Sequence, residues 1–328
     1  MLAVIKALWG VLVSCVTWVL GPILRLSNPH HDVPYASPSR VPPDPSVFPY
    51  YIQNKQGIWL KWTEWYPRKG ETRGVVFVCS GLGEHAARYD SVAKPLVAEG
   101  LHCFAMDHQG QGLSEGDRCY VERFADYVDD YCLFVRRTLT SYPELNGLPC
   151  FLLGHSMGGL MAILIAYRDP SAWKGVILSA PALEPDPNVA TPLMRKLATI
   201  MSNVFPKLGL DKLDVRKISN NPAIVQAAMQ DPAYGREKMQ ARWGYEMLQA
   251  MDQVWVGLHL STFPLLMLHG REDTLCIISG SRKFVQAANT SDKQLVEFDR
   301  MSHEVLTELN CGIVLAEVIK FIRDRMLK

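Results

Sequence analysis

The sequence predicts an α/β fold in which a mostly parallel sheet of about eight strands carries helices on both faces. Short apolar runs, typical of strands that are buried on both sides, recur along the chain and alternate with helical patterns. This alternation is typical of parallel strands joined by crossover helices. The length of 328 residues fits one such domain with an insertion.

The first 27 residues predict a membrane anchor. The segment from Ala7 to Leu24 has no charged residue. As a helix it would measure ~27 Å, close to the thickness of the hydrocarbon core of a bilayer. No small-residue cleavage site of a signal peptide follows it convincingly. We therefore expect an anchor or signal-anchor over residues 1–27, a Pro-rich linker over 28–49 and a globular domain over 50–328.

The globular domain begins with an aromatic-rich segment at 58–65, which alternates in part and predicts an early antiparallel strand. Parallel strands are expected at 74–80, 102–107, 149–153 and 174–180, with helices at 88–99, 120–142 and 160–167 between them. Further strands are expected at 264–269 and 294–298, and a last helix closes the chain.

The six residues from Gly154 to Gly159, Gly-His-Ser-Met-Gly-Gly, lie between an expected strand and an expected helix. A Gly-x-Ser-x-Gly sequence in this context predicts a sharp turn that exposes the hydroxyl of Ser156 at the edge of the sheet. The motif alone is a frequent chance match, so its partners decide its meaning. Asp273 follows a later strand, and His303 lies on a late loop before the last helix. Serine, acid and histidine in this order predict a catalytic triad.

The triad predicts acyl transfer. His303 would take the proton of Ser156 and return it to the leaving group, while Asp273 orients the imidazole. The backbone N–H groups of Met157 and Leu82 are expected to form the oxyanion hole. This chemistry requires neither a metal nor an organic cofactor.

An insertion is expected over about residues 183–262, where the alternation of strands and helices stops. Its position between the serine and the acid predicts a helical cap over the site. One apolar helical face is expected either to pack on the main domain or to cover an apolar substrate, or to do both. That face comprises Leu193, Leu197, Ile200, Met201, Val204 and Phe205.

Composition excludes some functions. Lys and Arg number 34 and Asp and Glu 33, and no basic cluster is interleaved with aromatics, which argues against a nucleic-acid partner. The eight cysteines lack metal-ligand spacing. Read as free thiols, they favour a reducing compartment and a cytosolic catalytic domain. The sequence does not predict an oligomeric state.

Together, the segments 81–85, 107–116 and 154–159 with Asp273 and His303 resemble the monoacylglycerol lipase and lysophospholipase family of alpha/beta-hydrolases. The resemblance covers about residues 50–328. It implies hydrolysis of the ester of a single-chain acyl lipid in a hydrophobic tunnel under the cap. It also implies that Glu84 and Arg88 line the pocket for the polar head, and that Cys276 lies near the active site.

Two departures from the family stand out. The family usually has His-Gly where this chain has Ser80-Gly81, and animal members have a glycerol-binding tyrosine where this chain has Ala228. The second departure favours broad head-group tolerance. We expect a monoacylglycerol lipase first. A lysophospholipase, a general carboxylesterase or thioesterase, an acyltransferase, a peptidase and a catalytically silent membrane-tethered binding protein are the alternatives.

Overall fold

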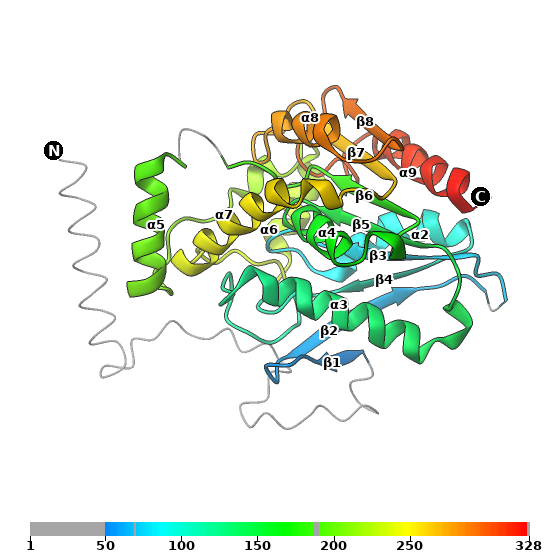
Figure 1. Cartoon of the computed structure of the whole chain (residues 1–328), viewed down its shortest axis with the longest axis horizontal. Helices are drawn as coiled ribbons and strands as arrows, with labels where there is room; N and C mark the ends of the chain where they lie inside the picture. Colours follow the sequence, from blue (N-terminus) through cyan, green and yellow to red (C-terminus); the bar gives the residue numbers. More distant parts are fainter. Residues whose placement is uncertain (1–49, 69, 186–189, 327–328) are drawn as a thin grey trace.

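A single eight-stranded sheet forms the centre of the molecule in the computed structural model, which describes residues 50–68, 70–185 and 190–326 (Figure 1). The strand order is β1-β2-β4-β3-β5-β6-β7-β8. β1 pairs with β2 and β2 with β4 in antiparallel fashion, and all other neighbours are parallel. The predicted fold class is therefore confirmed. The strands are β1 Tyr51–Gln53, β2 Trp59–Trp65, β3 Gly74–Cys79, β4 Leu101–Met106, β5 Cys150–His155, β6 Gly175–Ser179, β7 Leu265–Gly270 and β8 Lys293–Phe298.

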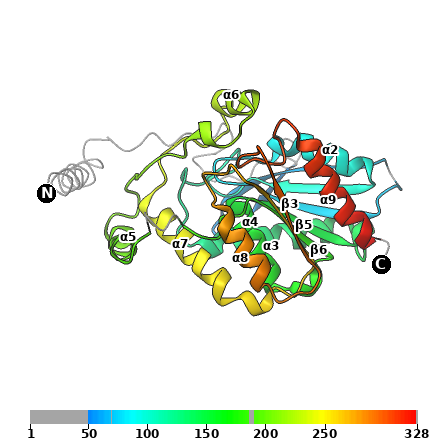
Figure 2. The same cartoon turned by 90° about the horizontal axis from the view of Figure 1, so that it is seen from above.

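Helices cover both faces of the sheet (Figure 2). Side chains alternate across the strands: Val75 and Phe77 pack with one group of helices, and Val76 and Val78 pack with the other. All four are fully buried, which explains the continuous apolar runs in the sequence. The first group is α3 Phe124–Ser141, α4 Met157–Arg168, α7 Ala241–Val256 and α8 Ile278–Ala287, and the second is α2 Asp90–Ala98 and α9 Cys311–Met326.

The parallel strands bring distant loops to one edge of the sheet. Cys79 at the end of β3 is in register with Gly154 on β5, and His155 is in register with Ser179 on β6. Gly270 on β7 is likewise in register with Phe298 on β8. The loops that carry Leu82, Ser156, Asp273 and His303 follow these strand ends, so they converge on one place.

Three helices, α5 Pro192–Val204, α6 Pro222–Gln230 and α7, lie between β6 and β7, in the predicted insertion. Within its described residues, the only β pairing is the isolated bridge Gly209–Gln240. α7 packs on α3 and α4 and belongs to the main core, whereas α5 packs on α7 at the edge of the molecule (Figure 1). The insertion is thus divided between core and periphery.

The apolar face of α5, which was expected to pack on the main domain, to cover a substrate or to do both, is mostly exposed among the described residues. Leu193, Leu197, Ile200 and Val204 are 69%, 44%, 47% and 52% exposed. Ser202 is the buried residue of this helix, so α5 turns a small polar side chain inward and leaves its larger apolar side chains outside.

No helix in the part of the chain that the structure describes is both long and apolar enough to cross a membrane. The predicted anchor over 1–27 and the predicted linker over 28–49 lie outside the described residues.

Candidate active site

Ser156 occupies the tight turn between β5 and α4. Its backbone lies in a strained region, with φ of 55° and ψ of −120°. The flanking glycines are required because a Cβ on Gly154 would lie 2.3 Å from the carbonyl oxygen of Gly158. A Cβ on Gly158 would lie 2.1 Å from the carbonyl oxygen of Cys79. The sequence therefore permits a turn that lifts the half-buried Ser156 side chain to the edge of the sheet.

Asp273 lies on the loop after β7 and accepts hydrogen bonds from three donors, with Nε2 of His269, which donates to the carbonyl of Cys276, also nearby. Its Oδ1 accepts hydrogen bonds from the backbone N–H groups of Leu275 (2.8 Å) and Cys276 (2.9 Å). Its Oδ2 lies 2.8 Å from Nδ1 of His303 and 3.2 Å from Nε2 of His269. Burial alone would raise the pKa of Asp273, but these partners outweigh it and hold the pKa far below its usual range. The carboxylate is therefore ionised at neutral pH.

His303 is buried and uses Nδ1 to bond Asp273, which leaves Nε2 as the nitrogen available for proton exchange. The ring of His155 lies against it, with ring centroids 4.6 Å apart. Burial and the neighbouring His303 lower the pKa of His155 to about 4, so His155 stays neutral and adds no competing charge.

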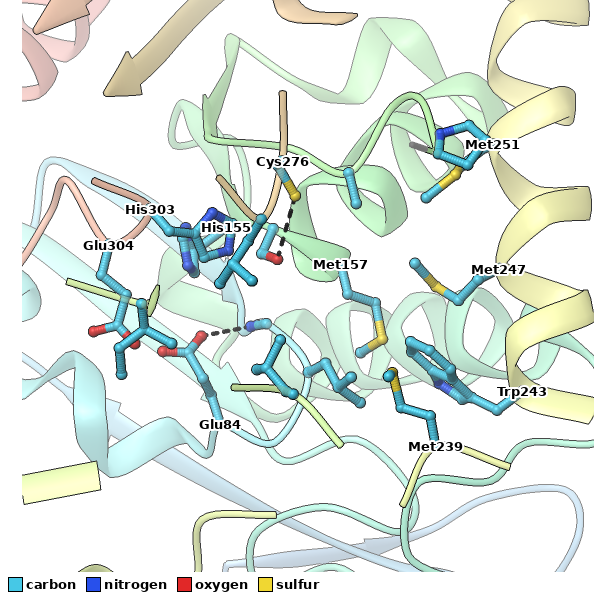
Figure 3. Close-up of a pocket in the computed structure, with 18 of the residues that line it drawn as sticks. Glu84, His155, Met157, Met239, Trp243, Met247, Met251, Cys276, His303 and Glu304 are labelled. Atoms are coloured by element: carbon cyan, nitrogen blue, oxygen red, sulfur yellow. Dashed lines mark hydrogen bonds between the residues drawn. The ribbon is translucent and has the colours of Figure 1, made fainter. Parts of the chain in front are cut away.

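Ser156 and His303 line one cavity of about 240 Å³. Figure 3 shows the acidic side chains Glu84 and Glu304 at one end, near His303, and the large apolar side chains at the other, with Met157 and Cys276 between them. The cavity is thus polar at one end and apolar at the other. Its apolar end is lined by Met239, Trp243, Met247 and Met251. Leu213, Ile218 and Leu275 also line the cavity, but they cluster with Tyr234, and the carbonyl of Ile218 accepts a hydrogen bond from the backbone N–H of Glu304.

The two predicted oxyanion donors are also at this cavity. Leu82 and Met157 both line it, and Met157 is the first residue of α4. Within the described residues, neither backbone N–H donates a hydrogen bond to another group of the protein. Both N–H groups are therefore free to bind an oxygen that develops negative charge beside Ser156, where the N-terminus of α4 adds its dipole.

A buried ion cluster closes the polar end. Nη2 of Arg88 lies 2.9 Å and 3.0 Å from the two carboxylate oxygens of Glu304, and its Nε lies 3.4 Å from Glu84. Glu84 also accepts hydrogen bonds from the hydroxyl of Tyr89 (2.7 Å) and the backbone N–H of Gly81 (2.6 Å). Burial and the neighbouring Glu84 raise the pKa of Glu304. For Glu84 burial opposes ionisation, but Arg88 and the hydrogen bonds lower its pKa.

The resemblance predicts three further residues at the site, and the structure places two of them, Glu84 and Cys276, at the main cavity. Glu84 lines the main cavity, as the resemblance implies, but Arg88 does not: it lines a smaller hollow behind it. This hollow shares Glu84, His155 and Glu304 with the main cavity, and two carboxylates hold the guanidinium of Arg88 there. Sγ of Cys276 lies 4.0 Å from Oγ of Ser156, yet burial raises the pKa of this thiol, so a reactive thiolate is disfavoured.

Sequence reasoning missed residues that only the fold brings to the site. His269 lies within β7 and contacts Asp273, and Glu304 follows His303 directly. Tyr234 lines the cavity, whereas Ala228, the position of the family's tyrosine, is fully buried. The insertion thus supplies a phenol to the cavity from a position six residues later. The histidine immediately before Gly270 and the glutamate immediately after His303 were the available signals.

In the described residues, no group of three or more His, Cys, Asp or Glu side chains is arranged to hold a metal ion. His85 pairs with Asp231 at 2.7 Å, and His108 bonds the carbonyl of Ser80 at 3.1 Å. Neither of these histidines lines the cavity.

Comparisons with known proteins agree with this geometry. A family model described as "Serine aminopeptidase, S33" matches residues 70–310. The chain is 34% identical to the monoglyceride lipase of Homo sapiens over 84% of this chain and 89% of that protein. It is 32% identical to the monoacylglycerol lipase of Mycolicibacterium smegmatis over 81% and 93%.

A solved structure extends the agreement to three dimensions. The crystal structure of Paleococcus ferrophilus monoacylglycerol lipase has a TM-score of 0.72 and 26% identity, over 81% of this chain and 99% of that chain. The predicted family resemblance is confirmed. The chain belongs to this family of serine ester hydrolases with the alpha/beta-hydrolase fold, among the relatives of monoglyceride lipases.

Proposed function

We propose that this enzyme hydrolyses the ester of a single-chain acyl lipid, with a monoacylglycerol as the first substrate and a fatty acid and glycerol as products. One observation carries the proposal: Ser156 lies in a cavity that has an acidic polar end and a methionine-rich apolar end. An ester placed at the serine would direct its acyl chain toward Met247 and Met251 and its head group toward Glu84. The relatives that are named monoglyceride lipases support the choice of glycerol.

In the proposed mechanism, the hydroxyl of Ser156 attacks the ester carbonyl while Nε2 of His303 accepts its proton. His303 returns that proton to the glycerol oxygen as the ester bond breaks, which leaves an acyl-enzyme. Water then attacks the acyl group by the same route and regenerates Ser156. Asp273, ionised and bonded to Nδ1, orients the imidazole and stabilises its charged form.

The backbone N–H groups of Leu82 and Met157 would stabilise the tetrahedral oxyanion. Loss of one such donor typically raises the barrier by about 3 kcal/mol. Neither donor depends on a side chain, so substitution at Leu82 or Met157 is expected to change the shape of the cavity more than the chemistry.

A lysophospholipase is the main alternative, because the same machinery cleaves any ester that fits. A carboxylesterase or thioesterase is the next. A silent binding protein is disfavoured because Ser156 and His303 line the same cavity and His303 contacts Asp273.

We also propose that the enzyme acts at a membrane, with residues 1–27 as its anchor and the catalytic domain in the cytosol. The exposed apolar side chains of α5 support a lipid surface nearby. A chain without residues 1–27 should leave the membrane fraction and still hydrolyse a soluble ester. If the truncated chain remains in the membrane fraction, another surface is the main anchor.

Two measurements test the proposed function. A fluorophosphonate should label the wild type and the Ser171→Ala control, whose substituted serine lies on the exposed surface, but not Ser156→Ala. Hydrolysis should then be compared for glycerol, glycerophosphocholine, methyl and coenzyme A esters of one fatty acid. The highest kcat/KM should belong to the glycerol ester. A higher value for the glycerophosphocholine ester would make the enzyme a lysophospholipase, and a higher value for the coenzyme A ester would make it a thioesterase.

A further inference from the structure

At the polar end of the cavity, acidic side chains outnumber basic ones. Two carboxylates, Glu84 and Glu304, share the single guanidinium of Arg88. The side chains of all three are nearly buried, with 7%, 5% and 12% of their surface exposed. The nearby His303 is already paired with Asp273, so it does not offset the extra carboxylate. Burial and the neighbouring Glu84 raise the pKa of Glu304 to about 7, so this cluster carries one net negative charge above pH 7, where both glutamates are ionised.

The positive charge of the cluster does not face the substrate. Nη2 of Arg88 contacts both oxygens of Glu304, and its Nε contacts Glu84. The ring of Tyr234 covers the guanidinium from another side, with Cζ 5.0 Å from the ring centroid. Tyr234 lines the main cavity, whereas Arg88 lines only the hollow behind it. A ligand in the cavity therefore meets the carboxylates and the phenol before it meets the cation.

The groups that face the cavity suit hydroxyls and repel anions. Ionised carboxylates only accept hydrogen bonds, and a polyol has hydroxyls to donate. The hydroxyl of Tyr234 makes no hydrogen bond with the described residues, so it can donate to or accept from a glycerol hydroxyl. A phosphate offers only acceptor oxygens and negative charge, and the described residues that line the main cavity include no arginine or lysine to bind it. Above pH 7, where Glu304 is ionised, the buried surroundings of the carboxylates strengthen this repulsion.

We propose that Glu304, together with Glu84, makes the head-group end of the cavity selective for uncharged polyols and excludes head groups that carry a phosphate. This inference rests on the proposed function, since it concerns the head group of the same acyl ester. Glu304 acts here as a specificity-determining residue. It recognises the correct head by accepting hydrogen bonds and rejects the wrong one by its charge.

The test compares kcat/KM at pH 8, where Glu304 is ionised, for a 1-acylglycerol and for the 1-acylglycerol 3-phosphate with the same acyl chain. The wild type should prefer the uncharged ester by about 100-fold. Glu304→Gln removes one negative charge and retains the size of the side chain, so it should reduce this ratio at least about tenfold, mainly through faster cleavage of the phosphate ester. The matched control is Glu272→Gln, which removes an exposed carboxylate outside the cavity and should leave the ratio unchanged.

A second measurement does not depend on turnover of a glycerol ester or on the folding of a variant. Uncleavable ethers, 1-alkylglycerol and 1-alkylglycerol 3-phosphate, should compete with a short p-nitrophenyl ester for the wild type. The uncharged ether should inhibit more tightly. Equal inhibition by the two ethers, or an unchanged ratio in a folded Glu304→Gln variant, would overturn the inference. If glycerol esters are not cleaved but the uncharged ether still inhibits more tightly, only the proposed function fails.

Discussion

The helices α5 and α7 come from the same insertion and both carry an apolar face, but those faces have opposite surroundings. On α7, Trp243, Met247 and Met251 are 6–8% exposed, and they contribute both to the core and to the wall of the cavity. On α5, Leu193 and Val204 are more than half exposed. An amphipathic pattern therefore establishes that a helix has an apolar face, but the tertiary neighbours decide what covers it.

The largest expected effect is the loss of hydrolysis itself, with which the effects of changes in α7 and α5 are compared. Ser156→Ala should lower kcat by a factor of about 10⁴ or more, because the attacking atom is lost. The apparent melting temperature should change little, since the side chain is only half buried. Hydrolysis of a soluble ester and thermal unfolding measure the two effects. Activity at even a few per cent of wild type would show that another residue is the nucleophile. The cavity that α7 lines would then not be the active site.

A pH-dependent effect is expected on α3, the helix on which α7 packs. Burial raises the pKa of Asp130 to about 7, while Asn54 donates it a hydrogen bond of 3.0 Å. Because this pKa is above that of the unfolded chain, the proton-linked stability from Asp130 is present at low pH and is lost as pH rises through 7. Asp130→Asn removes that dependence. It should raise the free energy of unfolding at pH 8, relative to its effect at pH 4, by about 4 kcal/mol.

Denaturant unfolding of wild type and variant at both pH values measures this difference, in which the contributions of all other titrating groups cancel. The same difference at pH 4 and pH 8 would show that Asp130 ionises normally despite its burial.

A larger side chain on α7 should narrow the cavity, whereas the same change on α5 should not, so the two variants test which helix contacts the acyl chain. Met247→Trp places a larger side chain at the apolar end, so kcat/KM for long-chain esters should fall about tenfold. Each methylene that loses its burial costs about 0.8 kcal/mol, whereas an acetyl ester loses almost nothing. The matched change on α5, Leu197→Trp, should leave the chain-length profile unchanged because Leu197 is outside the cavity. A shifted profile in Leu197→Trp would place the acyl chain under α5.

The smallest effect is expected from the exposed face of α5. Leu197→Glu with Ile200→Glu should lower activity on lipid vesicles about three- to fivefold and leave activity on a soluble short ester unchanged. Asn203→Glu, on the flank of the same helix, is the control for added charge. Equal activity of the double variant on vesicles and on the soluble ester would show that α5 does not contact lipid.

A feature of the fold or of the site could be predicted where a short stretch of sequence indicates it. The catalytic residues could be predicted because Ser156, Asp273 and His303 each follow an apolar run that predicts a strand. Parallel strands place their ends at one edge of the sheet, so these residues were expected to meet. Leu82 was placed by the same argument. The surroundings of α5 and the pairing of Arg88 with Glu304 could not be predicted, because no local sequence pattern indicates which side chains will contact them in the folded protein. Tyr234 was missed for the same reason.

The position of the insertion has a kinetic consequence. β6 and β7 are hydrogen-bonded neighbours in the sheet, yet residues 180–264 separate them along the chain. Closing a flexible loop of that length costs roughly 4 kcal/mol of chain entropy before any contact offsets it. Ser156 precedes this loop, and Asp273 and His303 follow it. During refolding the nucleophile therefore acquires its base only after β6 and β7 have paired, and the return of activity should lag behind the return of helical circular dichroism.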